Sequence, residues 1–174
     1  MKDILSKLSS YNIFNYLFPG VIYSVITTEL TCYNIIIKNI FIAFFVYYFI
    51  GLIISRIGSL VVEPLLKKIP FIVFTDYKDF VIASKKDDKI EILSEVNNMY
   101  RTIISLSFSI IITLAFNDFL GKYVSGFRYS HVIYYIGLII LMILFIFSYK
   151  KQTDYIKKRV SAIIEKMSIT NRST

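Results

Sequence analysis

Four long runs without a charged side chain constrain the fold of this chain more than any other feature. A helix of about 20 residues crosses the hydrocarbon core of a bilayer, which is about 30 Å thick. Within lipid, every backbone N–H and C=O must be paired inside the protein, and these runs lack the alternation of barrel strands. We therefore expect an all-α integral membrane protein with four transmembrane helices. The runs contain 21, 17, 16 and 18 residues and are Leu8–Thr28, Asn39–Ser55, Thr102–Asn117 and Val132–Tyr149.

The polar segment between the second and third runs divides the chain. It contains 8 of the 20 basic residues and 7 of the 12 acidic residues. We expect an N-terminal transmembrane hairpin over residues 1–55, with helices at about 11–30 and 36–60, followed by a cytoplasmic helical platform over 56–101. A C-terminal transmembrane hairpin should then cover 102–149, with helices at about 102–120 and 131–149. The last part, 150–174, is expected to be a basic cytoplasmic tail.

The basic residues predict the orientation of these parts. Seventeen of the 20 lie in the two termini and in residues 56–101, and three lie in the other two loops. The positive-inside rule then places both termini and the platform in the cytoplasm. The net charge of +8 fits anionic lipid better than nucleic acid, because the basic residues flank the apolar runs. With 56% hydrophobic and only 18% charged residues, the composition also excludes an ordinary soluble domain.

Local signals predict several helices in the platform. Pro64 and Pro70 are expected to break it into helical pieces. Residues 76–84 form a short amphipathic stretch, and Ser84 with Asp87 resembles a capping box. No helix breaker follows before Thr102, so the third transmembrane helix should extend well into the cytoplasm.

The tail keeps a helical apolar spacing at Ile156, Val160 and Ile163. Such a helix either lies on the inner leaflet or continues the fourth transmembrane helix and bundles with other helices. We favour the bundle.

No constellation of residues in the sequence indicates catalysis, a metal site or a cofactor site. His131 has no acidic residue close to it in the sequence, and Cys32 is the single cysteine. Gly-rich phosphate loops and the common zinc and nucleophile motifs are missing as well. We therefore expect a protein that is not an enzyme, with no catalytic, metal-binding or cofactor-binding residue.

Small residues recur at four-residue spacing in two of the expected membrane helices. They are Gly51, Ser55 and Ser59 in the second, and Ser105 and Ser109 in the third. Small residues allow helix backbones to approach closely, so these positions predict helix packing, either within the chain or between subunits. The alternative is a narrow pore lined by Ser105, Ser109 and Thr113 in an oligomer.

Several stretches resemble a known family. They are the opening LSSYNIFNYLFPG, the EPLLKK turn after the second helix and the DKIEILSEVNNMYRT start of the third. This plan resembles that of KwaA, the family of four-helix membrane subunits of the Kiwa anti-phage defence system, and the opening is also similar to that of related membrane proteins from anti-phage defence loci. The resemblance implies a tetrameric homo-oligomer in the bacterial inner membrane that senses phage attack. It also implies a cytoplasmic, KwaB-like partner that binds DNA. This chain would then contact nucleic acid only indirectly, through that partner.

Two functions follow as hypotheses. The first is a non-enzymatic scaffold and sensor that oligomerises in the bilayer and docks a soluble cytoplasmic partner. The second is a pore-forming effector that depolarises the membrane. For the scaffold, we expect docking through basic side chains of the platform and the tail. These are Lys85, Lys86, Lys89, Lys157, Lys158 and Arg159.

Overall fold

The computed structural model describes residues 10–68, 70–124 and 131–170, and within these ranges the chain is helical and contains no strand. This confirms the all-α expectation. The α-helices are α2 (Ser10–Asn12), α3 (Phe18–Leu30), α4 (Ile40–Ile57), α5 (Glu63–Lys68), α6 (Tyr77–Ser84), α7 (Lys89–Val124) and α8 (Val132–Thr170). Two π-helical turns, η1 (Ile13–Leu17) and η2 (Gly58–Val62), join α2 to α3 and α4 to α5.

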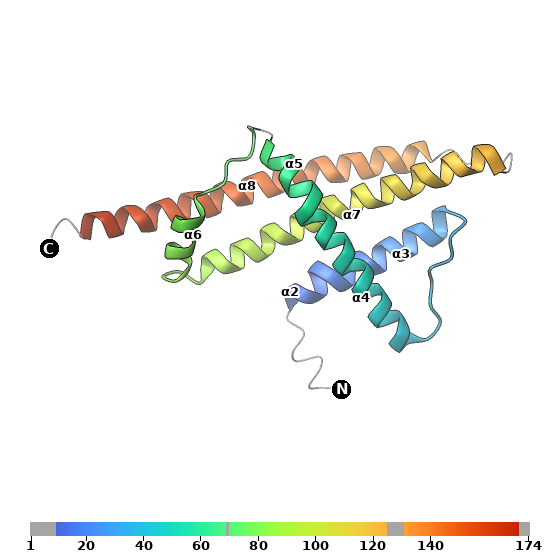
Figure 1. Cartoon of the computed structure of the whole chain (residues 1–174), viewed down its shortest axis with the longest axis horizontal. Helices are drawn as coiled ribbons and strands as arrows, with labels where there is room; N and C mark the ends of the chain where they lie inside the picture. Colours follow the sequence, from blue (N-terminus) through green and yellow to red (C-terminus); the bar gives the residue numbers. More distant parts are fainter. Residues whose placement is uncertain (1–9, 69, 125–130, 171–174) are drawn as a thin grey trace.

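The long helices α7 and α8 form an antiparallel pair around which the other helices are arranged (Figure 1). The hairpin of α3 and α4 packs on α7, and α4 crosses α7 obliquely in this view (Figure 1). The short α6 contacts both α7 and α8 near the start of α7 and the end of α8. The helix α7 therefore contacts α3, α4, α6, α8 and both π turns.

Among the residues that the structure describes, three helices are long and apolar enough to cross a membrane. They comprise Ile40–Lys68, Lys89–Gly121 and Val132–Ile169. The first expected span is also helical, from Ser10 to Leu30. It is not among the three, and it contains the polar residues Asn12, Asn15 and Glu29.

The expected break at Pro64 is wrong, since the helix continues through this residue to Lys68. A proline ring clashes with the carbonyl four residues earlier, but the wider π turn η2 ends two positions before Pro64 and relieves that crowding. The N–H of Glu63 accordingly reaches the carbonyl of Gly58, five residues back. The turn η1 has the same position relative to Pro19. There, the N–H of Phe18 donates to the carbonyl of Ile13, also five residues back.

The extension of the third helix and the continuation of the fourth are both confirmed, since α7 begins at Lys89 and α8 runs unbroken to Thr170. The capping box at Ser84 is wrong. Ser84 ends α6 and its hydroxyl donates to the carbonyl of Val81, so it cannot cap the next helix. Asp87 takes that role, because its carboxylate accepts from the N–H of Lys89.

Three buried apolar clusters fill the interfaces along the helix pair. One lies between α4 and α7, a second lies where α5 and the following loop meet α7 and α8, and the third joins α6, α7 and α8. In that order they contain Ile54, Leu106, Ile110 and Leu114; Val62, Leu66, Ile72, Ile104 and Tyr149; and Ala83, Ile90, Ile156 and Val160.

Two glycines allow the N-terminal helix to contact α4 backbone to backbone. A Cβ atom on Gly51 would lie 1.6 Å from the carbonyl oxygen of Tyr16, and one on Gly20 would lie 1.8 Å from that of Tyr47. No side chain fits at either position. This close approach supplies dispersion contacts, which matter most where helices meet in lipid.

We expect Gly51→Ala to destabilise the protein by about 1–3 kcal/mol, because the added methyl group must push the two helices apart. Gly137→Ala is the matched control, since Gly137 is also helical and a methyl group added there would meet no other atom within 4 Å. That change should be neutral or stabilise by up to about 1 kcal/mol. Thermal unfolding of both variants in mild detergent makes the comparison, and equal stability of the two would contradict it.

Candidate functional site

A buried polar cluster connects η1, α4 and α7 at the start of the apolar part of α7. The hydroxyl of Thr102 donates to the side-chain oxygen of Asn15 at 2.6 Å, and the Asn15 amide donates to the hydroxyl of Ser55 at 3.2 Å. Asn15 is 1% exposed and Thr102 is fully buried. A buried polar group without a partner is costly, so these contacts fix how the three helices are aligned.

Similar contacts continue along α7 in both directions, and we call the whole series the polar ladder. Toward the end of α7, Thr113 bonds the hydroxyl of Tyr23 at 2.8 Å, and the side-chain oxygen of Asn117 accepts from the N–H of Cys32 at 3.2 Å. Toward its start, Asn97 donates to Thr153 on α8 at 3.1 Å. Each contact joins α7 to a different segment.

An ion-pair group lies beside the ladder. Arg101 on α7 pairs with Glu63 on α5, and Lys67 contacts the other oxygen of the same carboxylate at 2.7 Å. The Arg101 and Glu63 side chains are only 14% and 20% exposed. This group ties the end of the α4–α5 helix to α7 and keeps the charges paired where the apolar run begins.

Helix α6, the first turns of α7 and the last turns of α8 pack into a compact three-helix unit. Its core is the cluster of Ala83, Ile90, Ile156 and Val160. Arg159 pairs with Asp87 across the unit, and this guanidinium holds the pKa of the Asp87 carboxyl below its usual value. The pair therefore adds stability at neutral pH that is lost as the pH falls through that lowered pKa.

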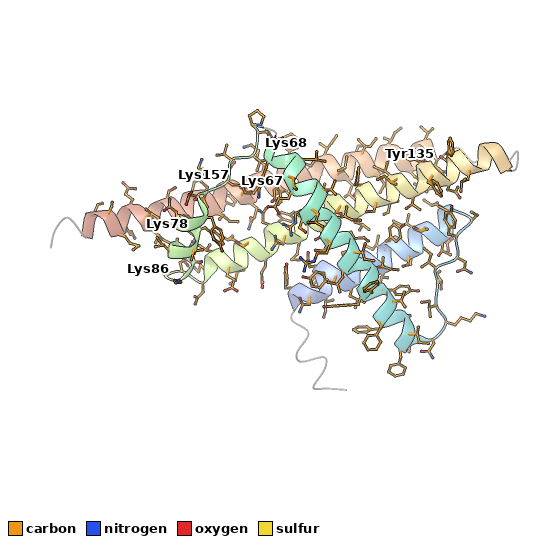
Figure 2. The ribbon with its side chains drawn as sticks, in the orientation of Figure 1. Lys67, Lys68, Lys78, Lys86, Tyr135 and Lys157 are labelled. Carbon is orange, nitrogen blue, oxygen red and sulfur yellow. The ribbon has the colours of Figure 1, made fainter. Side chains whose placement is uncertain are left out.

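The basic residues expected to dock a partner gather on the three-helix unit. Lys85, Lys86, Lys89 and Lys158 are exposed, and Lys157 is half-buried. Figure 2 shows Lys78, Lys86 and Lys157 at this end of the molecule, with Tyr135 near the opposite end. Arg159 differs from the others because it is already paired with Asp87. Within the described residues, no ion pair engages Lys85, Lys86, Lys157 or Lys158.

The small residues expected at helix contacts lie mostly inside this one chain. Gly51 meets the backbone of Tyr16, Ser55 belongs to the polar cluster, and the hydroxyl of Ser105 donates to the carbonyl of Ile54 at 2.7 Å. Ser59 instead bonds a carbonyl of its own helix, that of Arg56.

Gly58, and not Ser59, lies next to Ser105 of α7. A Cβ on Gly58 would lie 3.4 Å from that of Ser105. The residues of η2 follow a wider helical turn, which changes which residue faces α7.

Two of the three hydroxyls proposed to line a pore, those of Ser105 and Thr113, form hydrogen bonds within these helix contacts. Thr113 donates to the carbonyl of Ser109 and bonds Tyr23, and Ser105 bonds α4. The Ser109 hydroxyl is buried and has no hydrogen-bond partner among the described residues. The pore hypothesis gains no support from these contacts.

The structure gives His131 an acidic partner that its sequence neighbourhood did not reveal. Its Nδ1 lies 2.6 Å from a carboxylate oxygen of Asp118, and the hydroxyl of Tyr135 donates to the other oxygen at 2.8 Å. The partners come from the end of α7 and the start of α8, so the hairpin between them brings them together. This cluster closes the polar ladder at the end far from the three-helix unit.

No protein-family model, curated protein or solved structure matches this chain.

We expect Thr102→Val to destabilise the protein by about 1–2 kcal/mol, because the buried oxygen of Asn15 loses its short hydrogen bond. Ser148→Ala is the matched control, since that hydroxyl bonds only the carbonyl of Leu144 on its own exposed helix face. Its effect should stay within about 0.5 kcal/mol. Unfolding midpoints in detergent report both, and a control as damaging as Thr102→Val would refute the role given to the cluster.

Proposed function

We propose that this chain is a non-enzymatic membrane scaffold and sensor that presents the three-helix unit to a soluble cytoplasmic partner. The observation that carries the proposal is the continuity of α7 and α8. Both helices run without interruption from strongly apolar segments into the basic three-helix unit. A partner bound there is held at a defined position relative to the membrane helices.

Within this proposal, the helical segment 10–30 is a fourth span. Its start is tied to α7 by Asn15 and Thr102, and the loop directly after it is tied to α7 by Cys32 and Asn117, at the two ends of the apolar run of α7. Asn117 lies 15 positions after Thr102, which corresponds to about 22 Å along a helix. The first helix therefore accompanies α7 through most of a hydrocarbon core about 30 Å thick.

The charge of the three-helix unit indicates the chemistry of the partner. Exposed lysines without an ion pair attract an acidic surface and speed its encounter with the scaffold. The resemblance to the Kiwa membrane subunits implies a DNA-binding partner, a tetrameric assembly, the bacterial inner membrane and a role in phage defence. These parts of the proposal rest on the resemblance alone.

The four-span topology predicts the side of the membrane on which single cysteines react. Native Cys32 is exposed and should react with a membrane-impermeant maleimide in intact spheroplasts. Cysteines introduced as Lys2→Cys or Ser161→Cys, each in the Cys32→Ser background, should react only after permeabilisation. Labelling of position 2 from outside would eliminate the fourth span, and labelling of position 161 from outside would reverse the proposed orientation.

Charge reversal tests partner docking. Lys85→Glu/Lys86→Glu and Lys157→Glu/Lys158→Glu should each reduce the soluble protein that co-purifies with the tagged chain by about tenfold or more. Lys38→Glu is the control, because Lys38 lies in the loop before α4, far along the chain from the three-helix unit. Membrane insertion should be unchanged in all variants. Undiminished co-purification in both double variants would count against the proposal, as would a native mass showing a homo-oligomer without a partner.

A further inference from the structure

One face of α8 changes from apolar to basic where the charge-free run ends at Tyr149. A shallow groove lies on this face and is lined by Phe147, Lys150, Lys151, Asp154, Tyr155 and Lys158. Before the groove, Ile140 and Leu144 are exposed on the same side of the helix. An exposed apolar surface therefore leads directly into a cluster of cations.

The loop after α5 widens the apolar end of this groove. Phe71 packs edge-on against Phe147, with 5.4 Å between the ring centroids, and the Lys150 amine lies 5.1 Å above the Phe71 ring. Both rings remain partly exposed, Phe147 at 58%. This arrangement places a cation at the edge of an aromatic surface that water would otherwise cover.

The charges of the groove are only partly balanced within the chain. Lys150 pairs with Asp154 at 2.9 Å, whereas Lys151 lies over the ring of Tyr155 and Lys158 has no ion pair among the described residues. Three lysines thus face one acid. The groove keeps a net positive charge next to an apolar surface.

We propose that this groove binds an anionic phospholipid. Its acyl chains lie along Leu144, Phe147 and Phe71, and its phosphodiester lies between the amines of Lys150 and Lys151. Lysine stems are long enough to keep their amines at headgroup level while their methylenes contact the apolar surface. A zwitterionic lipid fits the same aromatic surface but loses the unbalanced charge attraction.

The inference requires that α8 crosses the bilayer, and it requires no protein partner. The groove shares Lys158 with the docking residues, but Lys85 and Lys86 do not line it. The Lys85→Glu/Lys86→Glu variant therefore tests docking alone, and failure of either proposal can be recognised separately.

The chain contains no tryptophan, which allows a clean reporter experiment. Phe147→Trp in the full-length protein places one fluorophore in the proposed site. Ile53→Trp is the matched control, since Ile53 is exposed and lies three residues before Arg56, as Phe147 lies three residues before Lys150. Each variant is reconstituted into vesicles of phosphatidylcholine and phosphatidylglycerol, with either lipid brominated in turn so that its acyl chains quench the reporter on contact.

At position 147, phosphatidylglycerol should be preferred over phosphatidylcholine by about fivefold, the attraction expected of one lysine beside an anionic headgroup. Adding Lys150→Gln and Lys151→Gln should bring this preference close to one and leave position 53 unchanged. Adding Lys85→Gln and Lys86→Gln instead should change neither position.

Three results would overturn the assignment. One is a preference at position 147 no larger than at position 53, since that indicates a diffuse surface charge. Another is a preference that survives the loss of Lys150 and Lys151. The last is a reporter at position 147 that neither brominated lipid quenches, because protein and not lipid would then cover the groove.

Discussion

The polar ladder of α7 is the interaction on which the rest of the structure depends. In a chain this apolar, hydrophobic burial cannot select one helix arrangement, because an apolar side chain gains little by leaving lipid for another apolar surface. Hydrogen bonds between buried side chains can select one, since a shifted helix leaves costly unpaired groups. Thr102, Thr113, Asn117 and Asn97 each contact a different segment, so one helix fixes the positions of the others.

The close backbone contacts of Gly20 and Gly51 complement the ladder. The glycines bring the N-terminal helix against α4, and Asn15 then bonds both Ser55 on α4 and Thr102 on α7. The π turn η1 carries Asn15 and ends two positions before Pro19, so the proline is accommodated without ending the helix. Close packing and hydrogen bonding thus act on the same short stretch of chain.

The sequence was sufficient to predict what depends on residues near each other in the chain. The apolar runs predicted helices, and the lack of a breaker before Thr102 predicted the long α7. Contacts between distant residues could not be predicted, because Asn15 and Thr102 are 87 positions apart and no local pattern relates them. The same holds for Asp87 with Arg159, and for His131, whose partner Asp118 lies across a hairpin. Pro64 was misleading for a different reason, since a π turn is a departure from regular helix that residue propensities do not reveal.

The unbroken helix α8 has a mechanical consequence. Its 39 residues correspond to a rod of about 58 Å, roughly twice the thickness of the hydrocarbon core. A rod of that length is a lever: a tilt of about 10° around its middle displaces each end by about 5 Å. The cluster of His131, Asp118 and Tyr135 holds the beginning of this lever, and the three-helix unit holds its far end. A change in bilayer thickness that alters the tilt of α8 would therefore be amplified into a displacement of the basic surface.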